Sequence, residues 1–169
     1  MKKYIMAAAV SLVCLTAFSF APAIGREYAP VEKTPETTTA FIDHALEKNG
    51  RYVLTVDQIE WYEGEEAVKA FLEREGDSGL DGPPDGYYIV DDEAELTELP
   101  VADDAEVLMQ IYNRTGDAAE ADIVWDEPIS LDKFIGLLQT EDVLSPLDFP
   151  YHLTVKDGVV TRIVQQYIP

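Results

Sequence analysis

The stretch YHLTVKDGVVTRIVQQYI, residues 151–168, contains two apolar-rich segments on either side of Lys156-Asp157-Gly158. An Asp-Gly pair favours the tight turn that joins two antiparallel strands, because both residues accept a positive φ. The flanking segments, 151–155 and 159–168, are rich in Val, Ile, Thr and Tyr, which are typical of strands. The stretch therefore predicts a β-hairpin, and with it a fold built on a sheet.

A second hairpin is predicted around Asn49-Gly50. The turn pair is followed by Tyr52, Leu54 and Val56 on alternate positions, and it is preceded by the strand-favouring run 37–39. One alternative stays open, because residues 35–48 also carry apolar side chains at helical spacing and Asn-Gly can end a helix.

The apolar alternation of this second strand changes phase along the chain. After Val56 the apolar residues move from even to odd positions, at Ile59 and Trp61. One extra residue in a strand produces such a change, so we expect a β-bulge near Asp57 or Gln58.

Shorter strands and two helices complete the predicted fold. Strands are expected at 87–90, 96–101, 106–112 and 123–125, with acidic turns at 91–95 and 102–105. A helix over 65–75 has Val68, Phe71 and Leu72 on one face, and a second helix begins at Ser130, a candidate N-cap. The pattern predicts an α+β protein: a curved antiparallel sheet or OB-like β-barrel with two short packed helices.

The N-terminal end has the features of an export signal. Lys2 and Lys3 precede the apolar segment 4–20, and Ala21-Pro22-Ala23 supplies small residues for cleavage. We therefore predict a signal peptide at 1–23, a linker at 24–36 and a single β-rich domain at 37–169. Cleavage would leave no membrane span and would localise the protein outside the cytoplasm, in the cell envelope or secreted. An uncleaved membrane anchor is the alternative.

The charge of the chain limits its partners. The 33 acidic residues outnumber the 12 basic ones and give a formal net charge of −21. This balance repels phosphate backbones, which argues against a nucleic-acid partner. Composition alone favours adaptation to a saline or alkaline exterior, and the functional alternative is a partner such as a basic protein, a cation or a cell-wall polymer. The lone cysteine, Cys14, lies in the predicted signal, so neither a disulfide framework nor thiol chemistry is expected after cleavage.

Three segments carry a family resemblance: LPVADDAEV at 99–107, Ile129-Ser130-Leu131 opening a helix, and DGVVTRI at 157–163. In their order they resemble uncharacterised exported proteins of Gram-positive bacteria. The order of strands, helix and closing hairpin is also similar to small OB-like barrels of bacterial envelope proteins. The resemblance covers most of the mature chain and implies a fold and a location, but it brings no catalytic residue.

Carboxylates gather in and after the loop at 76–86. Asp77, Asp81 and Asp85 recur every four residues, and Asp91 and Asp92 follow one strand later. Calcium prefers such oxygen ligands, so these five residues form a hypothetical weak site for Ca²⁺ in the millimolar range. The spacing does not match the EF-hand loop, and no other cofactor is predicted.

Three functions remain open. The first is a non-catalytic envelope or extracellular interaction module, for which the aromatic residues could line a groove or could simply serve the core: Trp61, Tyr62, Tyr87, Tyr88, Tyr112, Trp125, Tyr151 and Tyr167. The second is a calcium-binding or calcium-stabilised adhesion domain. His44 and His152 are the only imidazoles, and the third function is a small secreted hydrolase that uses His152 or an acidic pair such as Glu60 with Glu63 or Asp126 with Glu127. No catalytic residue is assigned, and we expect the first function.

Overall fold

The computed structural model describes residues 27–92 and 95–168. The predicted signal peptide at 1–23 lies outside the described residues. The helices and strands follow one another as β1 Thr37–Lys48, β2 Arg51–Glu63, α1 Gly64–Glu75, β3 Tyr87–Val90, β4 Leu96–Met109, β5 Glu127–Ile129, α2 Leu131–Leu138, β6 Pro150–Lys156 and β7 Val159–Gln165. Two short 3₁₀ turns, Ala118–Glu120 and Pro146–Asp148, lie in the connections. Within the described ranges, no helix combines the length and the apolar character that crossing a bilayer requires.

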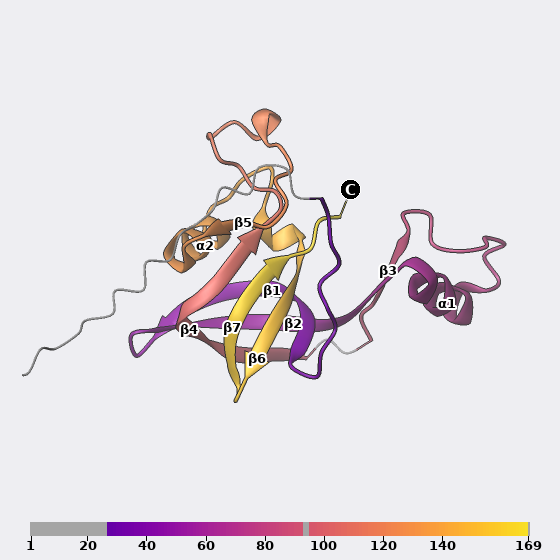
Figure 1. Cartoon of the computed structure of the whole chain (residues 1–169), viewed down its shortest axis with the longest axis horizontal. Coiled ribbons are helices and arrows are strands. Elements are labelled where there is room, and N and C mark those ends of the chain that lie inside the picture. Colours follow the sequence, from indigo (N-terminus) through magenta and orange to yellow (C-terminus); the bar gives the residue numbers. More distant parts are fainter. Residues whose placement is uncertain (1–26, 93–94, 169) are drawn as a thin grey trace, which may run out of the picture.

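Five of the strands close into a barrel (Figure 1). The order is β2-β1-β6-β7-β4, and β4 pairs back onto β2. The strand β3 extends the sheet beside β2, and β5 extends it beside β4. The predicted α+β class is confirmed, and the arrangement is compatible with an OB-like barrel.

One strand pair of the barrel is parallel. The strands β4 and β7 run parallel, whereas the other pairs of the sheet are antiparallel. Parallel neighbours need a long crossover connection, and β5, α2 and β6 lie between these two strands in the chain. This pairing joins segments far apart in sequence, which local patterns do not reveal.

The two predicted hairpins are confirmed. The strands β1 and β2 pair around Asn49 and Gly50, at φ 54° and 75°. The strands β6 and β7 pair around Asp157 and Gly158, at φ 50° and 77°. Positive φ at both central residues is the geometry of the tight hairpin turn that Asn-Gly and Asp-Gly favour. The segment 37–48 is therefore a strand, and the helical alternative is wrong.

The strand β4 differs from its prediction. Two strands, 96–101 and 106–112, were expected around an acidic turn, but one strand runs from Leu96 to Met109. Val101 and Ala105 are buried at both ends of the acidic segment, so the chain gains more from staying extended than from turning. An irregular register between Val101 and Glu106 opposite β7 takes up the intervening residues. The predicted strand at 123–125 is also absent from the described chain, where β5 begins later, at Glu127.

Both helices form where they were expected, and Figure 1 shows them at opposite ends of the molecule. The Ser130 hydroxyl accepts a hydrogen bond from the Lys133 amide at 3.2 Å, which confirms the N-cap. Phe134 of α2 is fully buried in the barrel core against Tyr151, with ring centroids 5.5 Å apart. The helix α1 instead packs on β2 and β3, outside the barrel.

The phase change in β2 does not come from a bulge at Asp57 or Gln58. Pairing with β1 is regular across those residues, and the irregularity lies on β1, between Ile42 and His44. Leu54 and Val56 belong to the core inside the barrel, whereas Ile59 and Trp61 are buried outside that core. The strand therefore buries first one face and then the other, because its second half leaves the barrel and pairs with β3.

Candidate functional site

A cavity of about 160 Å³ lies on the outer side of the barrel, beside β2 and β3. We call it the aromatic pocket, and it is defined by its lining residues Tyr28, Trp61, Glu63, Asp85, Gly86, Tyr87, Trp125, Gln166 and Tyr167. Five of these residues are aromatic, and they include both tryptophans of the chain. The residues come from five separate segments of the chain, so the pocket exists only in the folded protein.

Two groups of rings form the walls of the aromatic pocket. Trp61 on β2 stacks on Tyr87 at the start of β3, with centroids 4.8 Å apart and planes 16° from parallel. Trp125 contacts Tyr28 at 5.1 Å and Tyr167 at 5.9 Å. Trp61 and Tyr87 meet because β2 and β3 pair directly, which brings side chains of the two strands together. The second group joins an N-terminal segment, a loop and the C-terminal end.

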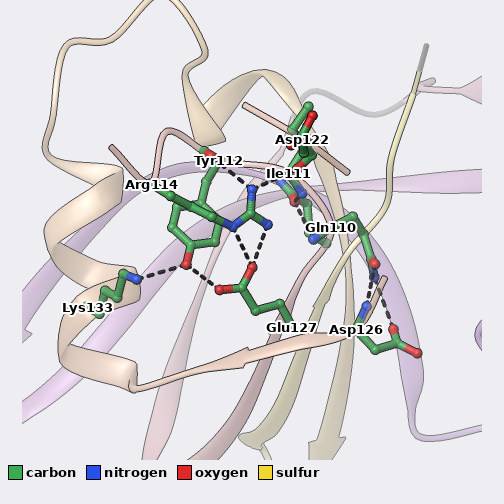
Figure 2. A network of polar contacts seen from close by, with 9 residues as sticks. Gln110, Ile111, Tyr112, Arg114, Asp122, Asp126, Glu127 and Lys133 are labelled. Carbon is green, nitrogen blue, oxygen red and sulfur yellow. Dashed lines mark hydrogen bonds and ion pairs between the residues drawn. The ribbon is translucent and has the colours of Figure 1, made fainter. Parts of the chain in front are cut away.

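Hydrogen bonds fix the backbone on both sides of Trp125. The Val124 amide donates to the Gln110 carbonyl at 2.8 Å. The Asp126 amide donates to Gln110 Oε1 at 2.7 Å, and Gln110 Nε2 donates to Asp126 Oδ1 at 3.2 Å (Figure 2). Gln110 is only 3% exposed. Gln110, just after β4, therefore fixes the backbone that carries the Trp125 indole through its own carbonyl and its side-chain amide.

A second set of polar contacts ties the same loop to α2 (Figure 2). Arg114 Nε donates to Glu127 Oε2 at 2.7 Å, and Arg114 Nη1 donates to the Asp122 carbonyl at 2.7 Å. The Tyr112 hydroxyl donates to Glu127 Oε1 at 2.7 Å and accepts from Lys133 Nζ at 2.8 Å. Both oxygens of Glu127 are thus engaged, which gives this carboxylate a structural role and argues against its use as an acid or base.

His152 lies next to Trp61 of the aromatic pocket, with the two rings nearly perpendicular and their centroids 6.5 Å apart. Gln166 Nε2 donates to the Tyr167 carbonyl at 2.9 Å, so Gln166 Oε1 is the atom that accepts from His152 Nε2 at 2.9 Å. His152 Nδ1 then accepts from the Thr39 hydroxyl at 2.9 Å. Burial lowers the pKa of His152, which keeps the ring neutral. Both ring nitrogens serve the fold, and neither has the carboxylate partner of a Ser-His-Asp arrangement.

His44 has a different set of partners. Its Nδ1 lies 2.6 Å from Asp43 Oδ2, and its Nε2 lies 3.1 Å from the Thr55 hydroxyl. Carboxylate, imidazole and hydroxyl thus follow one another as in a catalytic triad. Thr55 is only 6% exposed, however, which keeps its hydroxyl from a substrate in solution. The arrangement arises at the irregular register of β1, which brings Asp43 and His44 side by side.

The five aspartates of the calcium hypothesis occupy different parts of the chain. Asp77 and Asp81 lie in the exposed loop after α1, Asp85 lines the aromatic pocket, and Asp91 and Asp92 follow β3. Asp92 accepts two hydrogen bonds from Arg74, at 2.9 and 2.6 Å, and these lower its pKa. Among residues 27–92 and 95–168, no three carboxylate or imidazole side chains are grouped so as to hold a metal ion. Calcium binding stays a prediction, and a melting temperature raised by calcium but not by magnesium would support it.

The other acidic and aromatic candidates are spread over the molecule. Glu63 lines the aromatic pocket, while Glu60 accepts from the Tyr62 hydroxyl on the surface. Tyr112 and Tyr151 are buried in the core, and Tyr88 packs edge-on against Phe71 of α1. Only part of the predicted aromatic set therefore converges on one site.

Sequence reasoning missed Tyr28 and Gln166. Tyr28 is the one aromatic residue of the segment predicted as a linker, and its hydroxyl donates to Glu63 Oε2 at 2.8 Å. Lys33, also in that segment, pairs with Glu66 at 2.7 Å. A lone aromatic side chain in a polar stretch is the signal that could have identified Tyr28, because such a ring gains from a packing partner. Gln166 gives no comparable signal.

A larger hollow, about 560 Å³, lies elsewhere, around the loop after α2. Its lining runs from Leu138 to Leu147 and includes no aromatic, imidazole or basic side chain, and Val143 there is 93% exposed. It offers a ligand few oriented contacts, so the aromatic pocket is the better candidate despite its smaller volume. No protein-family model, curated protein or solved structure matches this chain.

Proposed function

We propose that this protein is an exported, non-catalytic interaction module that holds its partner in the aromatic pocket. Five aromatic rings and two carboxylates converge on one cavity of about 160 Å³, and this convergence is the main support for the proposal. Binding sites combine apolar walls with a few placed polar groups in this way. Tyr and Trp are also the residue types that contribute most to binding energy at interfaces.

The surroundings of the aromatic pocket support binding without reaction. The imidazole next to Trp61, that of His152, is neutral and is bonded at both nitrogens. The hydroxyl that reaches Glu63 belongs to Tyr28, whose pKa is raised to about 12, mainly by burial and then by the Glu63 hydrogen bond. A tyrosine with so high a pKa keeps its proton at neutral pH. The pocket therefore presents fixed donors and acceptors rather than a poised acid or base.

We further propose an envelope or secreted location and membership of the uncharacterised exported proteins of Gram-positive bacteria. Support comes from the leader-like segment 1–23, the acidic composition and the resemblance of 99–107 and 157–163. In that location a cation, a basic protein or a cell-wall polymer is the partner class that the charge favours.

Secretion and wall binding can be measured together. A Gram-positive host expresses the full chain, and the protein is recovered from the medium and mixed with insoluble cell walls. Mass spectrometry should show cleavage after Ala23, and the protein should sediment with the walls. Trp125→Leu should lose most of this binding, while Tyr62→Leu, next to Trp61 but outside the pocket lining, should keep it. Equal sedimentation of the two variants would contradict the proposal.

A small hydrolase is the second candidate, and one observation favours it: the chain of contacts Asp43, His44 and Thr55. In this function Thr55 would be the nucleophile and His44 its base. The burial of Thr55 stands against it. A panel of p-nitrophenyl esters tests it, and turnover by the purified protein that is lost in both His44→Gln and Thr55→Val would replace the binding proposal with this one.

A further inference from the structure

We infer that the chemical group held by the aromatic pocket is an organic ammonium cation, such as choline. This inference rests on the proposed function, because it names the ligand class of the same pocket.

The first argument is the density of aromatic faces. Tyr28, Tyr87, Trp125 and Tyr167 are each partly exposed while they line the cavity. The face of an aromatic ring carries negative potential, and several rings around one space form the cage that binds quaternary ammonium groups. Leaving this many rings exposed to water at one place is unfavourable in free energy, and a bound cation would offset that cost.

The second argument is charge. The cavity lining contains the carboxylates of Glu63 and Asp85, and within the described chain no lysine or arginine lines it. The charges of Glu63 and Asp126 also contribute to the raised pKa of Tyr28, so the potential at that hydroxyl is negative. Lys33, a basic residue of the described N-terminal segment, is paired with Glu66 and lies over the Tyr62 ring. The pocket therefore attracts a cation and repels an anion.

The third argument concerns size. A cavity of about 150 Å³ accommodates a benzene ring, and the aromatic pocket, at about 160 Å³, admits one compact head group of that size. A trimethylammonium group meets this condition.

A neutral sugar ring fits these groups less well. A sugar presents hydroxyls but no positive charge, so it would leave the carboxylates of Glu63 and Asp85 without a counter-charge, and Gln166 Oε1 is already occupied by His152. Two carboxylates and five aromatic rings in one lining favour a positive ligand over a neutral one. Sugar binding is therefore an alternative outcome of the test.

The test uses the secreted protein and its own fluorescence, because both tryptophans line the aromatic pocket. Choline chloride is titrated against sodium chloride at equal ionic strength, and 3,3-dimethylbutan-1-ol serves as the neutral probe, with carbon in place of the charged nitrogen. We expect a saturable fluorescence change with choline and binding of the alcohol that is about tenfold weaker or less. N-acetylglucosamine serves as the sugar probe.

Two variants locate the effect. Trp125→Leu should abolish choline binding, and Asp85→Asn should weaken it about threefold to tenfold while the circular dichroism spectrum is retained. Tyr62→Leu should bind as the wild type does. Equal binding of choline and the neutral alcohol, binding of the sugar alone, or no response to any probe would each overturn the ammonium inference. After any of these three results, sedimentation with cell walls decides the fate of the proposed function. If sedimentation still depends on Trp125, the proposed function stands without the ammonium inference; if it does not, the proposed function and the ammonium inference are both wrong.

Discussion

The barrel interior and the aromatic pocket are both built from large apolar side chains, but they are assembled in opposite ways. The interior takes alternate positions of paired strands, and Leu54, Val56, Leu153 and Ile163 are completely buried there. The pocket takes one to three residues from each of five segments that share no period. The interior therefore supplies the stability of the molecule, whereas the pocket adds a place for a partner at little cost to the fold.

The two regions also differ in how polar groups are used. The core cluster inside the barrel is composed of apolar and aromatic residues. The pocket instead depends on amide side chains just after strand ends. Gln110 accepts from the Asp126 amide, next to Trp125, and Gln166 accepts from His152. Directional hydrogen bonds can hold a ring in one place where no sheet ladder does so. Variants of the two regions should consequently fail in different ways.

The largest effect is expected inside the barrel. Phe134→Ala removes a fully buried ring that packs on Tyr151, and it should lower the free energy of unfolding by about 3–5 kcal/mol. Urea denaturation followed by circular dichroism measures the loss. Val143→Ala, at a residue that is 93% exposed, is the control and should change little. A small loss in the first variant would mean that α2 contributes little to the core.

A smaller effect is expected where the barrel supports the pocket. Gln110→Ala removes the acceptor of the Asp126 amide and the donor to its carboxylate, which should cost about 1–3 kcal/mol of unfolding free energy. Because the backbone beside Trp125 is freed, choline binding should weaken as well. Gln139→Ala, on the exposed end of α2, is the matched control. Full binding by Gln110→Ala would show that Trp125 is positioned by other contacts.

The buried imidazole should make stability depend on pH. Burial lowers the pKa of His152 below its ordinary value of 6.5, so the unfolded chain binds a proton that the folded chain resists. The stabilisation is complete above about pH 6.5 and is lost as the pH falls below that value, by at most about 1.4 kcal/mol per pH unit. Urea titrations at pH 7.5 and 5.5 give the change in unfolding free energy between these two pH values. This change should be smaller in His152→Gln than in His44→Gln, which removes an exposed ring instead. Equal differences for the two variants would contradict this assignment.

The smallest effect on stability is expected at the rim of the pocket. Asp85 is exposed and makes no side-chain hydrogen bond within the described chain, so Asp85→Asn should change the unfolding free energy by less than about 0.5 kcal/mol. Thermal melting of this variant beside the wild type measures it. A large loss of thermal stability would indicate that Asp85 supports the fold. The pocket would then contribute to stability as the barrel interior does, contrary to our account.

The same comparison explains what the sequence could predict. Both hairpins and both helices follow local rules: Asn49-Gly50 and Asp157-Gly158 suit one turn type, and Ser130 caps its helix. The parallel pair of β4 and β7 depends on contacts between distant segments, so no local pattern contains it. The phase change at Ile59 and Trp61 was visible in the sequence, but its cause was the switch to a second buried face.

The candidate site was less predictable than the fold. Trp61, Tyr87, Trp125 and Tyr167 were expected either in a groove or in the core, and spacing alone could not decide between the two. Tyr28 and Asp85 join them only because the N-terminal segment and the loop before β3 return to the same side of the barrel. Such convergence follows from tertiary packing, which composition and periodicity do not determine.

The central claim is that the partner is held at the aromatic pocket, and nuclear magnetic resonance tests it directly. The two tryptophans give two indole N–H signals, and both belong to the pocket. On addition of solubilised cell-wall fragments, we predict that both signals shift together with the Gln166 side-chain amide, while the methyl signals of Leu54 and Ile163 in the barrel stay in place. Shifts confined to another surface, such as the turn at Asn49 and Gly50, with both indole signals unmoved, would contradict the claim.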